Sequence, residues 1–176
     1  MVRRLEDIVR YLRFSYRSLR HVIMISSRIY RKYGIKTDIA ISSDRLVFLD
    51  MDDINDDTIN FVRGICRGFR AYGIILRSPY GHGYHFVLLK VLDKNRWNAF
   101  YNGIYDILNS KAGEKLTIDK VFVAMTLERG YTTLRLGHKT DYVIIINPDG
   151  SYKVHTDLTL DEFKDLVRTT LASEVE

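Results

Sequence analysis

The chain has 176 residues, of which 46% are hydrophobic and 28% are charged, a balance typical of one globular domain. Its one cysteine, Cys66, excludes an internal disulfide and an all-cysteine zinc site. Neither a signal peptide nor an apolar stretch of membrane-spanning length is recognisable, so we expect a cytoplasmic protein with no membrane partner. Glutamine is absent, which is one mark of proteins from thermophiles.

The net charge of +5 is unevenly distributed. Residues 1–36 contain ten Arg or Lys and two acids, a balance of +8, which leaves −3 for the remaining residues. A basic segment beside a mildly acidic body predicts a polyanionic partner such as nucleic acid. The candidate phosphate-binding side chains in this segment are Arg3, Arg4, Arg10, Arg13, Arg17 and Arg20.

The first half of the chain predicts helices and strands in turn. Apolar residues at three- and four-residue steps predict one or two amphipathic helices over residues 3–33. Strands are expected at 38–42 and 45–51, and the second is apolar on both faces, as in a covered central strand. A helix is then expected from Asp56 to about Tyr72, ended by Gly73.

The second half begins with two short strands, 74–76 and 84–91, around a turn rich in glycine. A helix over 94–110 follows, and then a polar loop. Asn147-Pro148-Asp149-Gly150 predicts a hairpin turn, and a last helix is expected over 161–171. Further strands are predicted at 121–126, 131–136 and 142–146.

The central order of strand, helix, strand, strand, helix, strand predicts an α+β fold. It is typical of a split βαβ sheet, as in RNA-recognition (RRM-like) domains, with helices packed on one face. We expect extra strands to extend this sheet. The whole chain is interpreted as a single domain with a basic helical segment at 1–36, a core at 38–146, and a hairpin and helix at 147–176.

Asp50 and Asp52 end the apolar run Leu46–Leu49. Two residues apart on a strand, they point to the same face, with Cα atoms about 6.5 Å apart. Two carboxylates beside a buried strand are costly unless a cation lies between them. With a third acid, such a pair predicts a site for two Mg²⁺ or Mn²⁺ ions. The alternative is an ordinary strand end followed by an acidic turn.

Three further groups are candidates for the same site. Asp119 follows an apolar strand-like run; alone it is typical of a turn or a helix cap, and it gains a metal-binding role only beside the aspartate pair. Ser78 and His85 flank a turn whose glycines allow a phosphate to approach the backbone, although a lone histidine is usually packed in a strand. A compact cationic turn supplies Arg135, His138 and Lys139, either to hold phosphates or as ordinary surface charge.

In this order, the motifs resemble those of the archaeo-eukaryotic primase superfamily. That family has an apolar strand ending in Asp-x-Asp, a Ser-to-His hairpin signature, a third acid after an apolar residue, and a basic strand with a following His or Lys. The matching segments are Leu46–Asp52, Ser78–His85, Ile118-Asp119 and Arg135–Lys139, within roughly residues 38–146.

The resemblance implies a primase or polymerase core that joins nucleoside triphosphates on a single-stranded or primed nucleic-acid template. It implies that Asp50, Asp52 and Asp119 hold two divalent ions, and that Ser78 and His85 contact the phosphates of the incoming nucleotide. The basic turn, with Arg135 and either His138 or Lys139, would steady the triphosphate.

The chain also departs from the family. It is short, it has no zinc-binding module, and it carries Pro79 and Tyr80 where many relatives have basic residues. Template-directed extension is therefore expected rather than de novo priming. A minimal enzyme of a mobile element, or a core that works with a helicase, fits this pattern, and a degenerate inactive relative stays open.

Two other functions are open. A nicking enzyme of the replication-initiator or relaxase type needs a tyrosine nucleophile, for which Tyr101 and Tyr105 are candidates. It also needs two histidines around one apolar residue, whereas two residues separate His82 from His85. A non-catalytic nucleic-acid-binding module on the same sheet is the other alternative, although the aromatic signature of RNA-recognition domains is missing.

Overall fold

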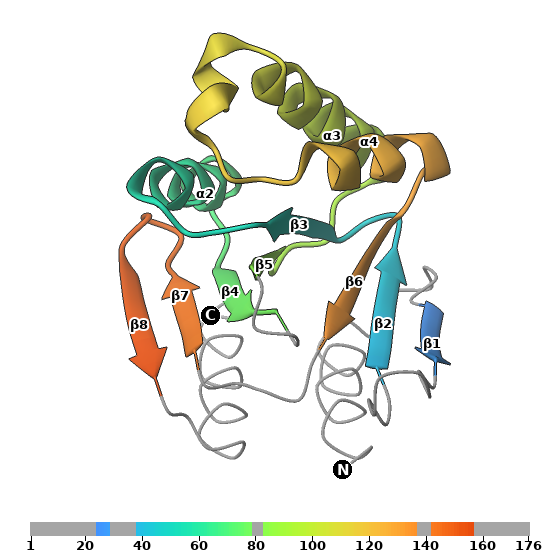
Figure 1. Cartoon of the computed structure of the whole chain (residues 1–176), viewed down its shortest axis with the longest axis horizontal. Coiled ribbons are helices and arrows are strands. Elements are labelled where there is room, and N and C mark those ends of the chain that lie inside the picture. The colour runs from blue at the N-terminus through green and yellow to red at the C-terminus, as the bar shows by residue number, and fades with distance from the viewer. Residues whose placement is uncertain (1–23, 29–37, 79–82, 137–141, 157–176) are drawn as a thin grey trace.

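The computed structural model describes residues 24–28, 38–78, 83–136 and 142–156 (Figure 1). Several predictions therefore lie outside the described residues. These are the helices expected before residue 24 with their six arginines, the turn at 79–82, His138 and Lys139, and the helix at 161–171.

The strands form two antiparallel sheets. A five-stranded sheet has the order β3-β5-β4-β7-β8, and a three-stranded sheet has the order β1-β2-β6. β3 and β4 both pair antiparallel with β5, which lies between them. The strands are β1 (Met24–Arg28), β2 (Asp38–Ser43), β3 (Val47–Met51), β4 (Gly73–Arg77), β5 (Tyr84–Leu88), β6 (Thr132–Leu136), β7 (Tyr142–Ile146) and β8 (Tyr152–Thr156).

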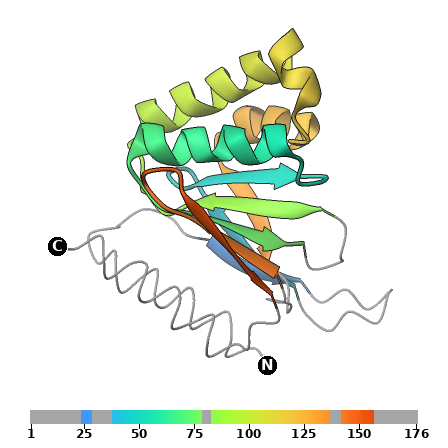
Figure 2. The same cartoon turned by 90° about the vertical axis from the view of Figure 1, so that its left-hand side faces the viewer.

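The described helices are α2 (Asp56–Phe69), α3 (Lys94–Leu108), the 3-10 helix η2 (Lys111–Lys115) and α4 (Lys120–Arg129). α2, α3 and α4 lie over one face of the larger sheet (Figure 2). The architecture is therefore α+β, as predicted. None of the described helices is long and apolar enough to cross a membrane.

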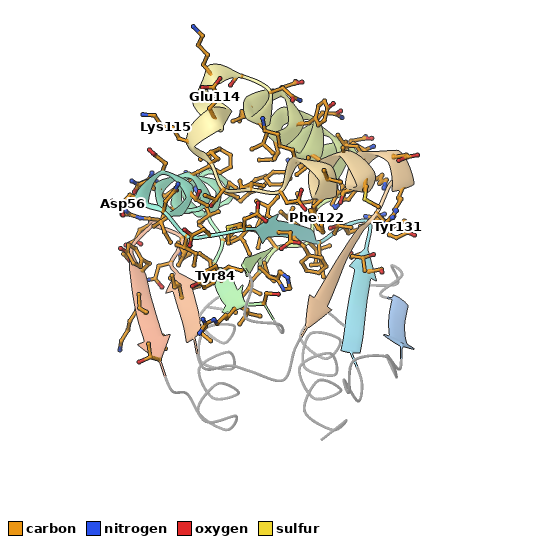
Figure 3. All side chains as sticks on the ribbon, viewed as in Figure 1. Asp56, Tyr84, Glu114, Lys115, Phe122 and Tyr131 are labelled. Atoms are coloured by element: carbon orange, nitrogen blue, oxygen red, sulfur yellow. The ribbon has the colours of Figure 1, made fainter. Side chains whose placement is uncertain are left out.

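Alternate residues of the central strands supply the main core. Side chains from β3, β5, β4 and β7 point towards the helices and fill the space beneath them (Figure 3). The opposite face carries a smaller apolar cluster that includes Ile74 and Val143. The sheet side of the main core consists of Val47, Leu49, Met51, Ile75, Phe86, Leu88, Ile144 and Ile146.

Two buried aromatic side chains of α3 hydrogen-bond to the outer edge of β3. Trp97 Nε1 donates to the Leu46 carbonyl at 2.9 Å. The Tyr101 hydroxyl donates to the Phe48 carbonyl at 2.6 Å and accepts from the Phe48 N–H at 3.0 Å. Both side chains are fully buried, so α3 satisfies backbone groups of β3 that no neighbouring strand reaches.

The helix predicted to run to Tyr72 ends earlier. α2 begins after Asn55, whose side chain accepts from the Thr58 N–H, and it ends at Arg70, which has φ of 49°. Gly73 does not end the helix; it begins β4. Its lack of a side chain serves packing instead, because a Cβ there would lie 2.6 Å from Cys66 Sγ and 2.6 Å from the Phe86 ring.

Two other secondary-structure predictions were wrong. Residues 24–28, expected to be helical, form β1 and pair with β2 along its whole length, so this part of the 1–36 segment is not a helix. The strand predicted at 121–126 is instead α4. Its β-branched residues favour a strand, but an Asp119 cap at one end and Gly130, with φ of 72°, at the other favour the helix.

The hairpin at 147–150 was predicted correctly. The Asn147 N–H donates to the Ser151 carbonyl at 2.8 Å, and β8 follows this turn. The polar loop expected after the helix at 94–110 begins with η2.

The packing at Gly73 predicts a measurable loss of stability. Gly73→Ala forces a methyl group against Cys66 and Phe86 and should cost about 1–3 kcal/mol. Gly64→Ala is the matched control, because its Cβ would meet nothing within 4 Å inside α2, and it should gain about 0.5–1 kcal/mol. Urea unfolding of both variants checks the pair; a Gly73→Ala protein as stable as the parent would contradict the packing argument.

Candidate functional site

The candidate site lies at the carboxyl end of β3. Asp50 on β3 is paired with His85 on β5, so the two side chains share one face of the sheet. His85 Nε2 lies 3.5 Å from Asp50 Oδ1. Strand alternation places this face opposite the helices, because the neighbouring Leu49 and Met51 belong to the core under the helices.

Asp119 reaches Asp50 from the other side of β3. Met51 and Ile118 form an isolated antiparallel bridge, which sets Asp119 opposite Asp50. The Asp119 N–H donates to the Asp50 carbonyl at 2.9 Å, and the Asp52 N–H donates to the Thr117 carbonyl at 2.8 Å. Directly opposed residues have Cβ atoms about 4.5–5.5 Å apart, so backbone pairing brings the third acid beside the pair.

Asp52 follows the last residue of β3, and the hairpin turn that begins at Ser78 lies beside this end of the strand. The Ser78 N–H donates to the Gly83 carbonyl at 3.0 Å, which closes the turn after β4. Gly83 has φ of 78°, and a Cβ on it would lie 2.5 Å from the Met51 carbonyl oxygen. Only glycine fits this approach to β3. Ser78 is buried, and Asp52 is exposed.

The electrostatics of Asp50 show that the carboxylates act on one another. Burial, the charge of Asp119 and the charge of Asp52, in that order, raise the pKa of Asp50 to about 6. A hydrogen bond from the Met51 backbone opposes this rise. The charged form of Asp50 is therefore disfavoured in the folded protein, and a nearby cation would relieve the cost.

His85 is neutral at physiological pH, because burial lowers its pKa to about 4. Its side chain is 8% exposed and faces a carboxyl whose own pKa is raised. The contact between His85 and Asp50 is thus not a strong ion pair: desolvation disfavours the charged form of each partner. A neutral imidazole can donate one hydrogen bond and accept another.

Asp119 has a second role as the cap of α4. Its Oδ1 accepts from the backbone N–H of Val121 at 2.7 Å and of Phe122 at 3.2 Å. The residue is therefore a helix cap, as one interpretation of the sequence predicted, and it also raises the pKa of Asp50.

The donor set fits a hard divalent cation but does not form a closed cage. Within the described ranges, no group of three or more His, Cys, Asp or Glu side chains is already arranged to hold a metal ion. Mg²⁺ commonly uses one or two carboxylates and completes its octahedron with water and substrate phosphates. Three carboxylates that share one strand edge, one of them with a raised pKa, suit that open kind of site.

Of the other predicted site residues, Arg135 is the one that the structure describes. It lies on β6, where its Cα pairs with that of Ala40 in the smaller sheet, and β6 contacts β3. The nucleophile proposed for the nicking alternative does not fit at Tyr101, because that side chain is fully buried, holds the backbone of Phe48, and has a pKa raised by burial. Tyr105 is exposed on α3, across the sheet from His85.

Three polar residues that were not predicted from the sequence hold the Asp119 segment in place. Asn55 Nδ2 donates to the Lys115 carbonyl at 2.9 Å. The Thr58 and Thr117 hydroxyls lie 2.9 Å apart, and the Thr117 N–H donates to Thr58 Oγ1 at 3.0 Å. The only sequence signal was the capping position of Asn55 before an acidic helix start.

Comparisons with protein-family models, with curated proteins and with solved structures found no match.

The raised pKa of Asp50 predicts that its charge destabilises the metal-free protein. The folded state binds this proton more tightly than the unfolded state, so the contribution of Asp50 to stability is present below about pH 4 and is lost as pH rises through about 6. Asp50→Asn should therefore raise the unfolding midpoint by about 2–4 °C at about pH 7, the shift that about 1 kcal/mol gives once solvent screening is allowed for.

Thermal unfolding in a chelating buffer tests this expectation. The gain should disappear near about pH 3.5, where the carboxyl is neutral in both states. Asp106→Asn on the exposed surface of α3 is the control and should change the midpoint little at either pH. A lower midpoint for Asp50→Asn at neutral pH would show that the carboxylate is stabilising and that the three acids do not repel one another.

Proposed function

We propose that the protein is a metal-dependent nucleotidyltransferase of the primase–polymerase type, which adds nucleotides to a nucleic-acid 3′ end on a template. The observation that carries this proposal is the backbone pairing that sets Asp119 beside Asp50, on the face where Asp50 meets His85. Three carboxylates opposite a histidine are the constellation on which the resemblance to the archaeo-eukaryotic primase superfamily depends.

The strand order supports the RRM-like split βαβ core that this function implies. α2 connects β3 to β4, and β5 is inserted between these two strands. After α3, the chain returns along the free edge of β3 at Thr117–Asp119. This return stands where a fourth strand of a split βαβ sheet would lie, shortened to a single bridge.

In the proposed site, Asp50, Asp52 and Asp119 hold two Mg²⁺ or Mn²⁺ ions. When bound, such ions activate the attacking 3′-hydroxyl and stabilise the negative charge on the leaving pyrophosphate. Asp52 is the exposed member and is the most accessible to an ion that arrives with a substrate. Asp50 gains most from ion binding, because its charge is disfavoured without one.

His85 and Ser78 would orient the triphosphate of the incoming nucleotide. A neutral His85 donates a hydrogen bond to a phosphate oxygen without neutralising the carboxylates beside it. Ser78 follows β4 and donates its N–H to the Gly83 carbonyl, and Gly83 lies against the end of β3 at Met51. By sequence alone, Arg135 with His138 or Lys139 is assigned to the same triphosphate.

The proposed partners are a single-stranded or primed template, nucleoside triphosphates and a helicase or another replication protein. The arginines of residues 3–20 are assigned to template phosphates. Binding that depends on them should weaken steeply with salt, because each neutralised phosphate releases counterions.

Incorporation of labelled nucleotides on a primed template tests the proposal. Activity should require Mn²⁺ or Mg²⁺ and should fall by more than about a hundredfold in Asp52→Ala and in His85→Ala. Asp52→Ala is the sharper variant, since its exposed side chain makes no hydrogen bond to the described core, and the protein should stay folded by circular dichroism. Full activity in Asp52→Ala or His85→Ala would refute the site.

Asp119 requires a special control because it also caps α4. Asparagine is an equally good helix cap but carries no charge. Asp119→Asn should therefore retain the stability of the parent and lose incorporation, whereas Asp119→Ala should lose both. If the Asp119→Asn variant is active, Asp119 is only a helix cap, and the proposed site lacks its third acid.

A further inference from the structure

We propose that Thr58 and Thr117 are positioning residues, which hold Asp119 and Asp52 in the geometry that a divalent ion needs. This inference rests on the proposed function, but the effect of the two threonines on the geometry of the acids can be tested without polymerase activity. We call the paired hydroxyls of Thr58 and Thr117 the threonine bridge. It joins the first turn of α2 to the segment that carries Asp119.

The hydrogen bonds of the threonine bridge form one consistent chain. Thr117 Oγ1 donates to the Asp53 carbonyl at 2.5 Å. Its single proton is thereby used, so in the 2.9 Å contact between the two hydroxyls Thr58 is the donor. Thr58 Oγ1 also accepts the Thr117 N–H at 3.0 Å. Each threonine hydroxyl thus donates one hydrogen bond and accepts one.

The threonine bridge fixes the backbone segment that pairs with β3 at Asp52 and Asp119. The Thr117 carbonyl accepts from the Asp52 N–H, and two residues later the Asp119 N–H donates to the Asp50 carbonyl. Asn55 adds a second tie, to the Lys115 carbonyl, from the turn before α2. Figure 3 shows the start of α2, at Asp56, on the same side of the molecule as Lys115.

The need for such a tie follows from the weak pairing of this segment. Residues 117–119 form only a single bridge with β3, whereas the strands of the larger sheet pair over four or five residues. Electrostatics also opposes the arrangement, because the charges of Asp119 and Asp52 both raise the pKa of Asp50. Without the threonine bridge, repulsion between carboxylates would favour the separation of Asp119 from β3.

The alternative is that Thr58 serves only the stability of α2. Its side chain is fully buried, so loss of the hydroxyl leaves Thr117 groups without partners. The two interpretations differ at the site. A residue that only stabilises the fold would change neither local opening at Asp52 and Asp119 nor ion affinity beyond what a comparable buried threonine changes.

Thr58→Val tests the inference, because valine keeps the shape and removes the hydroxyl. Two quantities are measured in the full chain: amide hydrogen exchange at Asp52 and Asp119, and Mn²⁺ affinity by paramagnetic resonance of the free ion. We expect exchange at these amides to accelerate and Mn²⁺ affinity to fall by about 10–100-fold, the range for groups that orient metal ligands. Thr58→Ser should restore both.

Thr126→Val is the matched control, since Thr126 is also buried but lies on α4 away from the threonine bridge. It should leave both quantities as in the parent. If Thr58→Val behaves like Thr126→Val, or accelerates exchange without weakening Mn²⁺ binding, the positioning role is overturned. Failure of the parent to incorporate nucleotides would refute the proposed polymerase activity alone, and exchange and Mn²⁺ affinity would still decide whether Thr58 positions the acids.

Discussion

The outer edge of β3 is the constraint on which the rest of the structure depends. Backbone groups on this edge point away from β5 and need other partners. In chain order, they belong to Leu46 just before β3, to Phe48 and Asp50 within it, and to Asp52 just after it. Trp97 and Tyr101 satisfy the first two residues through side chains of α3. The backbone of Thr117 and Asp119 satisfies the last two. The beginning of this edge is therefore attached to α3, and its end carries the candidate site.

This division explains why the acids meet where they do. The part of β3 that lies under α3 is apolar on both sides, with Phe48 only 2% exposed, and it accommodates no charge. Further along β3, residues 117–119 replace the side chains of α3 as its neighbours, and there the carboxylates can remain partly in water. Asp50 stands at that boundary: half-buried, with a raised pKa and a neutral histidine beside it. Its position costs stability, as is common at functional sites.

Much of the site could be predicted from local patterns, because its parts are local. The apolar run before Asp50 predicted a buried strand, which is β3. The period of two also predicted that Asp52 shares the face of Asp50; β3 ends at Met51, but the charge of Asp52 does act on Asp50. The glycine-rich turn between Ser78 and His85 predicted a hairpin, and β4 pairs with β5. By contrast, no local pattern carries the pairing of Asp119 with Asp50, which joins distant segments through one bridge.

The errors have the same origin. Val121 and Val123 favour a strand, but Asp119 and Gly130 cap a helix that packs beside α3. Met24–Arg28 falls within the range 3–33 that was predicted to be helical, yet it pairs with β2. The threonines of the bridge were missed because a threonine in the first turn of a helix is ordinary by itself. Tertiary contacts, which the sequence does not display, decide these cases.

The hydroxyl of Tyr101 has a consequence beyond the site. It occupies both the N–H and the carbonyl of Phe48, which are the groups that another polypeptide would need in order to add a strand there. α3 therefore shields an apolar template for intermolecular pairing. Any condition that detaches α3 while the sheet persists would expose β3, whose Val, Phe and Leu make it aggregation-prone. Aggregation would then compete with refolding.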